Sequence, residues 1–131
     1  MRFRRAWMMA VVGLALPVDA AWADVPLTVS HQGYITSQGT PFSGTGQFRF
    51  ALIDPASGNN LWTNDGTQTG TANAPDTAVA LPVAGGIYSV ELGDAGLPNM
   101  TALTGGLFDA VPLALRVWFD DGAHGVQLLS P

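Results

Sequence analysis

The sequence predicts an all-β protein, an antiparallel β-sandwich of about seven strands with one short helix. Several stretches alternate apolar and polar residues with period two, and clusters of Gly, Pro, Asn and Asp separate these stretches. In addition, no long stretch repeats apolar residues at the spacing of an amphipathic helix. The 131 residues suffice for one small domain, and no internal repeat indicates a second one.

Seven stretches carry the strand pattern, and the longest of them alternates most regularly. In that stretch Leu113, Leu115 and Val117 alternate with Ala114 and Arg116. We therefore expect it to lie inside a sheet with Leu115 buried, so that Leu115→Ala costs roughly 2–5 kcal/mol. The predicted strands are Leu27–Ile35, Gln47–Asp54, Asn60–Thr63, Thr77–Pro82, Ile87–Leu92, Val111–Asp120 and Ala123–Leu129.

Turn residues define the connections between these strands. Asp121-Gly122 separates the last two predicted strands and favours a hairpin there. Residues 66–75 are rich in Thr, Gly, Ala and Asn, which fits either a long loop or a weak edge strand. The short helix is expected at Leu97–Leu103, because Gly105-Gly106 follows as a stop signal.

The first 23 residues have the pattern of a secretory signal peptide. Arg2, Arg4 and Arg5 precede an apolar run over residues 6–18, and Ala21-Trp22-Ala23 matches the small-x-small cleavage pattern. We expect cleavage after Ala23, a single domain over residues 24–131, no membrane span after cleavage, and export to the periplasm, the cell surface or the medium. The alternative is an uncleaved N-terminal anchor, although the run is short for a bilayer-spanning helix.

Charge and cysteine content exclude several classes of function. The five basic residues are all Arg, against ten acidic residues, and cysteine is absent. Removal of residues 1–23 leaves two arginines and nine acidic residues, and hence a formal net charge of −7. A nucleic-acid partner is therefore not expected, because a basic patch for phosphates is missing. Disulfides, thiolate metal sites and cysteine nucleophiles are excluded as well.

Few residues are candidates for chemistry, and the sequence predicts no enzyme, no cofactor and no metal site. His31 could serve as a base beside nearby serines, but no Gly-x-Ser-x-Gly motif accompanies it. We expect His31 at a sheet margin and His124 exposed in a hairpin. Asp120-Asp121-Gly122 could contribute oxygens to a calcium ion, yet the spacing of a calcium-binding loop is absent.

Three aromatic residues are candidate contacts for a ligand or a partner. Tyr34, Trp62 and Trp118 could offer rings to a sugar if they are exposed. The alternative is that each tryptophan packs in or beside the core, since tryptophan is highly buried on average. For Trp118 we expect a covered face.

The order of motifs along the chain resembles an N-terminal β-rich domain of exported bacterial surface or tail-fibre-like proteins. That domain is often followed by repeats or by a C-terminal intramolecular chaperone domain. Two departures are His31, where the family tends to have Tyr, and Pro131, beyond which relatives usually continue. The matching segments are His31-Gln32-Gly33-Tyr34-Ile35, Phe48-Arg49-Phe50-Ala51-Leu52-Ile53-Asp54, Leu61-Trp62-Thr63, Gly86-Ile87-Tyr88-Ser89-Val90-Glu91-Leu92-Gly93, Leu107-Phe108-Asp109 and, loosely, Gln127-Leu128-Leu129-Ser130-Pro131.

The resemblance implies an architectural or attachment module without catalytic residues to carry over. We therefore expect an exported, non-enzymatic structural, attachment or assembly module, with a protein partner or a following domain at the C-terminal edge. The alternatives are a carbohydrate- or ligand-binding module that uses the exposed aromatics, and a small hydrolase.

Overall fold

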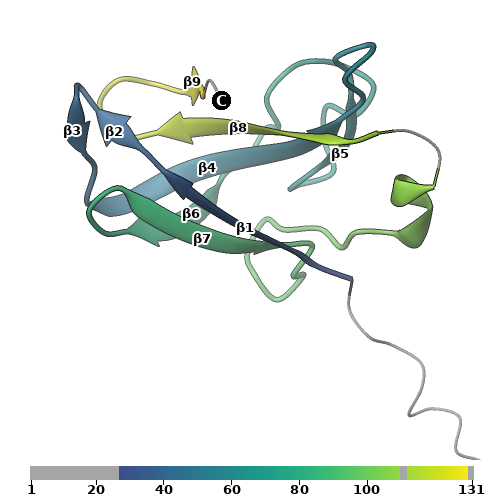
Figure 1. Ribbon diagram of the computed structural model, residues 1–131, viewed down its shortest axis with the longest axis horizontal. Helices are drawn as coiled ribbons and strands as arrows, with labels where there is room; N and C mark the ends of the chain where they lie inside the picture. Colours follow the sequence, from purple (N-terminus) through teal and green to yellow (C-terminus); the bar gives the residue numbers. More distant parts are fainter. Residues whose placement is uncertain (1–26, 110–111, 130–131) are drawn as a thin grey trace, which may run out of the picture.

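The computed structural model describes residues 27–109 and 112–129, which form two packed layers of β-strands (Figure 1). The predicted all-β, sandwich-like fold is confirmed. The predicted signal peptide and its cleavage site lie outside the described residues. Within the described ranges, no helix is long and apolar enough to cross a membrane.

The larger sheet is built around one long strand. β4 (Gly44–Ile53) pairs along one side with β8 (Ala114–Asp120), which in turn pairs with β9 (Gln127–Leu128). Along its other side, β4 pairs first with β6 (Val79–Val83) and then with β5 (Asn60–Thr63). All of these pairs are antiparallel, so β8 has the interior position that its regular alternation predicts.

The second layer is smaller. β1 (Val29–Tyr34) and β7 (Ile87–Leu92) pair antiparallel over their full lengths. A short hairpin of β2 (Thr36–Ser37) and β3 (Thr40–Pro41) follows β1. β6 and β7 belong to different layers and are joined by a tight turn with an Ala84–Ile87 bridge, which connects the two layers along one side (Figure 1).

The core lies between the two layers and is rich in aromatic rings. Phe48 and Phe50 of β4 are fully buried, and the Tyr88 ring of β7 lies 4.3 Å from the Phe48 ring. Phe119 of β8 packs on the same Phe48 ring, with 5.1 Å between the centroids. Aromatic rings at these distances contribute beyond the area that they bury, and they hold the two layers together.

The sequence located most of these elements. Residues 60–63 and 87–92 are strands with the predicted limits, and the predicted antiparallel pairing of the last two strands is confirmed by β8 and β9. The predicted tight turn at Asp121-Gly122 is wrong, because a loop over residues 121–126 connects the two strands. β9 is shorter than predicted because the Asp121 carboxylate accepts the backbone N–H groups of Ala123 and His124. These N–H groups are thereby held in a loop and not in a β-ladder.

The predicted helix at Leu97–Leu103 is wrong. Asn99 has a left-handed backbone, with φ of 63°, and the Thr101 N–H donates to the distant Asn64 carbonyl at 2.6 Å. A long-range contact has therefore replaced the local helical hydrogen bond. The one helical element of the described residues is a 3₁₀ turn at Gly105–Phe108. Residues 66–75 form turns and bends with no strand among them. Of the two alternatives for this stretch, the long loop is therefore correct and the weak edge strand is wrong.

Candidate functional site

The two candidate tryptophans, Trp62 and Trp118, do not form an exposed platform. Trp62 is 7% exposed, and its indole N–H donates to the Ala102 carbonyl at 3.1 Å. Trp118 is also 7% exposed, and the Arg116 guanidinium lies 5.9 Å from its ring centre. Neither ring offers a free face to a sugar, so the buried alternative holds for both. Tyr34, at 58% exposed, is the member of this trio that solvent reaches.

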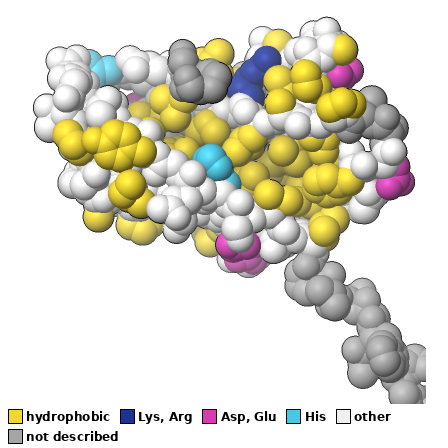
Figure 2. Space-filling view, viewed as in Figure 1, with side chains coloured by type: hydrophobic (Ala, Val, Ile, Leu, Met, Phe, Trp, Pro, Cys, Tyr) yellow, Lys and Arg dark blue, Asp and Glu magenta, His cyan; other side chains and the backbone are white. Residues whose placement is uncertain are grey.

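An apolar groove runs along the side of the sandwich opposite the β6–β7 turn. It has a volume of about 450 Å³ and lies between the free edge of β1 and strand β8, and we call it the β1–β8 groove. Figure 2 shows hydrophobic side chains gathered on this face of the molecule, next to a histidine. The groove is lined by His31, Gly33, Tyr34, Tyr88, Leu115, Val117 and Leu129.

One polar pair lies in this apolar lining. Nε2 of His31 and the hydroxyl of Tyr88 are 3.0 Å apart and share a hydrogen bond. Burial lowers the pKa of His31 and raises the pKa of Tyr88, so both groups are held in their neutral forms. A Cβ atom at Gly33 would overlap the Tyr88 ring, which explains why glycine stands there. The margin position expected for His31 agrees with this geometry.

The described part of β9 pairs with only one end of β8. The Leu129 N–H donates to the Val117 carbonyl at 2.9 Å, so the Val117 carbonyl faces the side on which β9 lies. Because backbone groups alternate sides with period two, the N–H and C=O of Leu115 face that same side. β9 pairs only with Trp118 and Phe119, and no other described strand pairs with β8 there. Among residues 27–109 and 112–129, no strand therefore pairs with β8 at Leu115.

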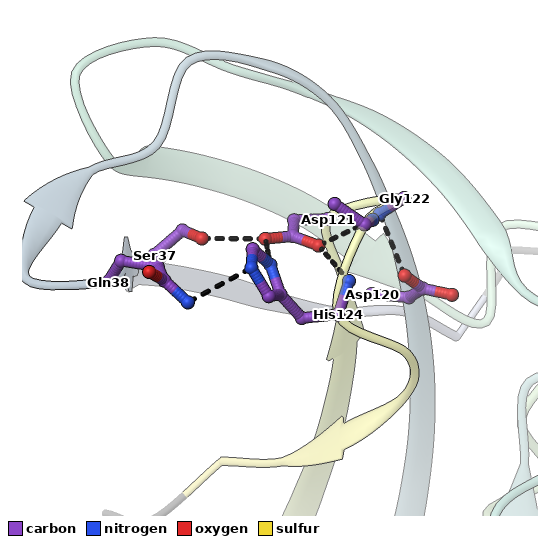
Figure 3. A network of polar contacts seen from close by, with 7 residues as sticks. Ser37, Gln38, Asp120, Asp121, Gly122 and His124 are labelled. Atoms are coloured by element: carbon purple, nitrogen blue, oxygen red, sulfur yellow. Dashed lines mark hydrogen bonds and ion pairs between the residues drawn. The ribbon is translucent and has the colours of Figure 1, made fainter.

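A second cluster of polar residues lies at the other end of β8 (Figure 3). The Ser37 hydroxyl donates to the Asp121 carboxylate at 2.6 Å, and Nδ1 of His124 donates to the same carboxylate at 2.7 Å. The Gln38 amide nitrogen lies 2.9 Å from Nε2 of His124 and can donate to it. These contacts, with the loop N–H groups, hold the pKa of Asp121 well below its usual range.

This second cluster lacks the geometry of a nucleophilic triad. The serine contacts the carboxylate and not the imidazole, and the free imidazole nitrogen faces the amide of Gln38. A histidine that activates a serine must accept the serine's proton directly. The cluster instead connects the β2–β3 hairpin to the loop before β9. His124 is exposed in that loop, where the sequence placed it.

Both carboxylate oxygens of Asp121 and one of Asp120 accept hydrogen bonds within the protein. Oδ1 of Asp120 accepts the Gly122 N–H at 2.7 Å, while Asp121 is engaged with Ser37 and His124. Across residues 27–109 and 112–129, no group of three or more His, Cys, Asp or Glu side chains gathers in a way that could hold a metal ion.

The sequence analysis identified some of the residues that line the groove and missed the others. It identified Tyr34 as a contact and Leu115 and Val117 as one face of a strand, although it placed Leu115 in the interior. It did not identify Tyr88 or Leu129 as part of a site. The available signal was the apolar face of residues 113–119, which is longer than β9 can cover.

Comparison with known proteins gives one match. Residues 30–131 match a family described as a domain of unknown function, DUF8740. No curated protein and no solved structure matches the chain. Since the match spans most of the sequence, the chain belongs to the DUF8740 family.

Proposed function

We propose that this protein is an exported, non-enzymatic module that serves structure, attachment or assembly. The observation that carries the proposal is the β1–β8 groove, a mostly apolar hollow on a well-packed sandwich. A concave, mostly apolar groove of this kind is a common form of binding site in soluble proteins. The signal-peptide pattern of residues 1–23 supports the exported location.

The carbohydrate-binding alternative has lost most of its support. Sugar platforms use flat, exposed aromatic faces, and two of the three candidate rings are buried. Tyr34 alone keeps an exposed ring, and it lies in the groove. A glycan array with the wild-type chain and Tyr34→Ala checks this point. We expect no glycan to bind, whereas a glycan signal that disappears in Tyr34→Ala would restore the alternative.

Expression of the full chain in a bacterial host tests the proposed function. Cell fractionation with N-terminal sequencing should find a species that begins at Asp24 outside the cytoplasm. The exported protein should show no turnover on panels of ester, glycoside and peptide substrates. Uncleaved protein in the cytoplasm would contradict export, and turnover that His31→Ala abolishes would contradict the non-enzymatic role.

A further inference from the structure

We propose that a cleft between β6 and β7 binds an extended, basic segment of another polypeptide, which adds a strand to the edge of β7. This β6–β7 cleft lies on the side of the sandwich opposite the β1–β8 groove and has a volume of about 240 Å³. It is lined by Leu81, Ser89, Val90, Glu91, Asp94 and Leu97. The inference rests on the proposed role in attachment or assembly and deepens it, because it assigns the chemistry of one partner.

The cleft forms where a proline stops the β6–β7 hairpin. Ala84 and Ile87 exchange two backbone hydrogen bonds across the Gly85-Gly86 turn, at 3.1 and 3.0 Å. Continued pairing would set Pro82 opposite Ser89, but proline has no N–H to donate to the Ser89 carbonyl. β6 pairs instead with β4 of the larger sheet, and β7 pairs with β1. The two strands therefore diverge from their turn.

The edge of β7 that faces this cleft has backbone groups to offer. The N–H and C=O of Ile87 both point to β6, so those of Ser89 and Glu91 point to the same side, because backbone groups alternate with period two. The Glu91 carbonyl accepts the Asp94 N–H at 3.3 Å. Beyond the bridge at Ile87, no strand of the described ranges pairs with β7 on this side. Ser89 thus presents one donor and one acceptor to the cleft.

A strand edge of this kind fits a peptide better than other ligands. An extended peptide supplies both an N–H and a C=O at every second residue. A polyamine supplies donors only, and a lipid tail supplies neither group. The two carboxylates of the cleft do not belong to any group of three or more potential metal ligands in the described chain.

The charge of the cleft indicates a basic segment. Glu91 and Asp94 line it, and no basic residue does. The Ser30 hydroxyl donates to Glu91 at 2.6 Å and the Gly96 N–H donates to Asp94 at 3.0 Å, and both donors are neutral. Neither carboxylate takes part in an ion pair within residues 27–109 and 112–129. A cationic side chain at this position is therefore complementary.

A second copy of the chain is a poor source for this segment. The described residues contain two arginines and no lysine, against eight acidic residues, so two copies repel one another. Arg49 and Arg116 already donate to backbone carbonyls of loops on the larger sheet. Within one copy, Leu27 leads into β1 on the other edge of β7, and Leu129 lies beside β8. We therefore infer a separate, basic polypeptide.

The alternation of faces sets the pattern of the segment. A residue opposite Ser89 or Glu91 shares the outer face with these exposed side chains, where a cation pairs with Glu91. The next residue points inward, toward the buried side chains of Leu81 and Val90. Basic and aliphatic residues should therefore alternate along the segment.

Synthetic peptides test the inference on a chain that begins at Asp24, which keeps every described residue. The probe is a hexapeptide in which arginine alternates with valine, and the control peptide has three arginines followed by three valines. We expect the alternating peptide to bind at least about tenfold more tightly by calorimetry. The amides of Ser89 and Glu91 should gain protection from hydrogen exchange, whereas the Val90 amide, which faces β1, should not change.

N-methylation separates strand addition from charge attraction. Methyl groups on the three arginine nitrogens remove the N–H donors that face β7, so they should abolish binding. Methyl groups on the three valine nitrogens leave these donors in place at the same peptide charge, so binding should persist.

A variant of the protein tests the charge. Glu91→Gln keeps an oxygen that accepts the Ser30 hydroxyl and removes the charge, so it should weaken binding about threefold. Asp54→Asn is the matched control, because it removes the same charge from the loop between β4 and β5, and it should leave binding unchanged. Near-ultraviolet circular dichroism checks that both variants fold, and the methylated peptides keep the test decisive if one does not.

Three results would overturn the inference: equal binding of the alternating and control peptides, binding that survives methylation of the arginines, or a stable dimer in sedimentation with the Ser89 amide already protected. The last result would identify a second copy as the occupant. None of these measurements depends on export or on turnover, so a failure of this inference and a failure of the proposed function are distinguishable.

Discussion

Substitution of Asn64 should lower the stability of the fold by a large amount for a side chain of this size. Its side chain has no exposed surface and makes three hydrogen bonds to the backbone of distant segments. Oδ1 accepts the Phe50 N–H at 2.9 Å, and Nδ2 donates to the carbonyls of Thr77 and Asn99, each at 3.0 Å. The side-chain amide of Asn64 thus connects three parts of the fold: strand β4, the segment that precedes β6, and the loop that follows β7.

Asn64→Ala leaves three backbone groups without their partner. A buried group that loses its hydrogen bond costs about 1–3 kcal/mol, and water entering the space that the amide leaves can satisfy part of this demand. We expect the free energy of unfolding to fall by about 3–5 kcal/mol, which is a large share of the stability of a small domain. Urea unfolding followed by tryptophan fluorescence measures the change.

Asn59→Ala is the matched control, because Asn59 is exposed and its side chain makes no hydrogen bond in the described residues. It should change stability by less than about 0.5 kcal/mol. A loss below about 1 kcal/mol in Asn64→Ala would refute the reasoning, because the three bonds would then contribute no more than an exposed side chain does.

Three further predictions concern the groove and its surroundings. Leu115→Ala should cost about 1–2 kcal/mol in urea unfolding, less than the sequence alone suggests, because Leu115 is only half-buried. Gly33→Ala should lower the melting temperature by several degrees, since the new methyl group overlaps the Tyr88 ring, whereas Gly105→Ala is the control, because nothing lies within 4 Å of a methyl group there. Burial lowers the pKa of His31 in the folded state below 6.5, so the unfolded chain takes up the proton at a higher pH than the folded chain. The free energy of unfolding should therefore fall as the pH drops below 6.5 and become constant below the lowered pKa. His31→Gln should remove this pH dependence.

Local sequence patterns were sufficient to predict the strands, but they were insufficient to predict the conformation of the loops. Residues 87–92 were predictable because apolar and polar side chains alternate directly after a Gly-Gly turn. The helix at 97–103 failed because the Thr101 N–H finds its acceptor in Asn64, a residue 37 positions earlier in the chain. The sequence shows Asn64 only as part of an Asn-Asp-Gly turn. Its role as a buried connector depends on which segments converge there.

The groove could not be predicted from alternation for a related reason. Alternation identifies which side chains of a strand share a face, but it does not state which strands cover that face. Leu115 has the pattern of a core residue, and it would be one if a neighbouring strand ran along its whole length. Within residues 27–109 and 112–129, β9 pairs with only one end of β8, and β1 pairs only with β7. The groove lies between β1 and β8.

The two sides of the sandwich differ in how their polar groups are satisfied, and this difference supports a binding role for the open side. On the loop side Asn64 and Asp65 bond to backbone groups of several segments, so that end is rigid in itself. On the groove side the one side-chain hydrogen bond between lining residues is that of His31 with Tyr88, while the Leu115, Val117 and Leu129 side chains pack against the core. A preformed apolar hollow on a rigid scaffold can accept a ligand with little reorganisation of the domain.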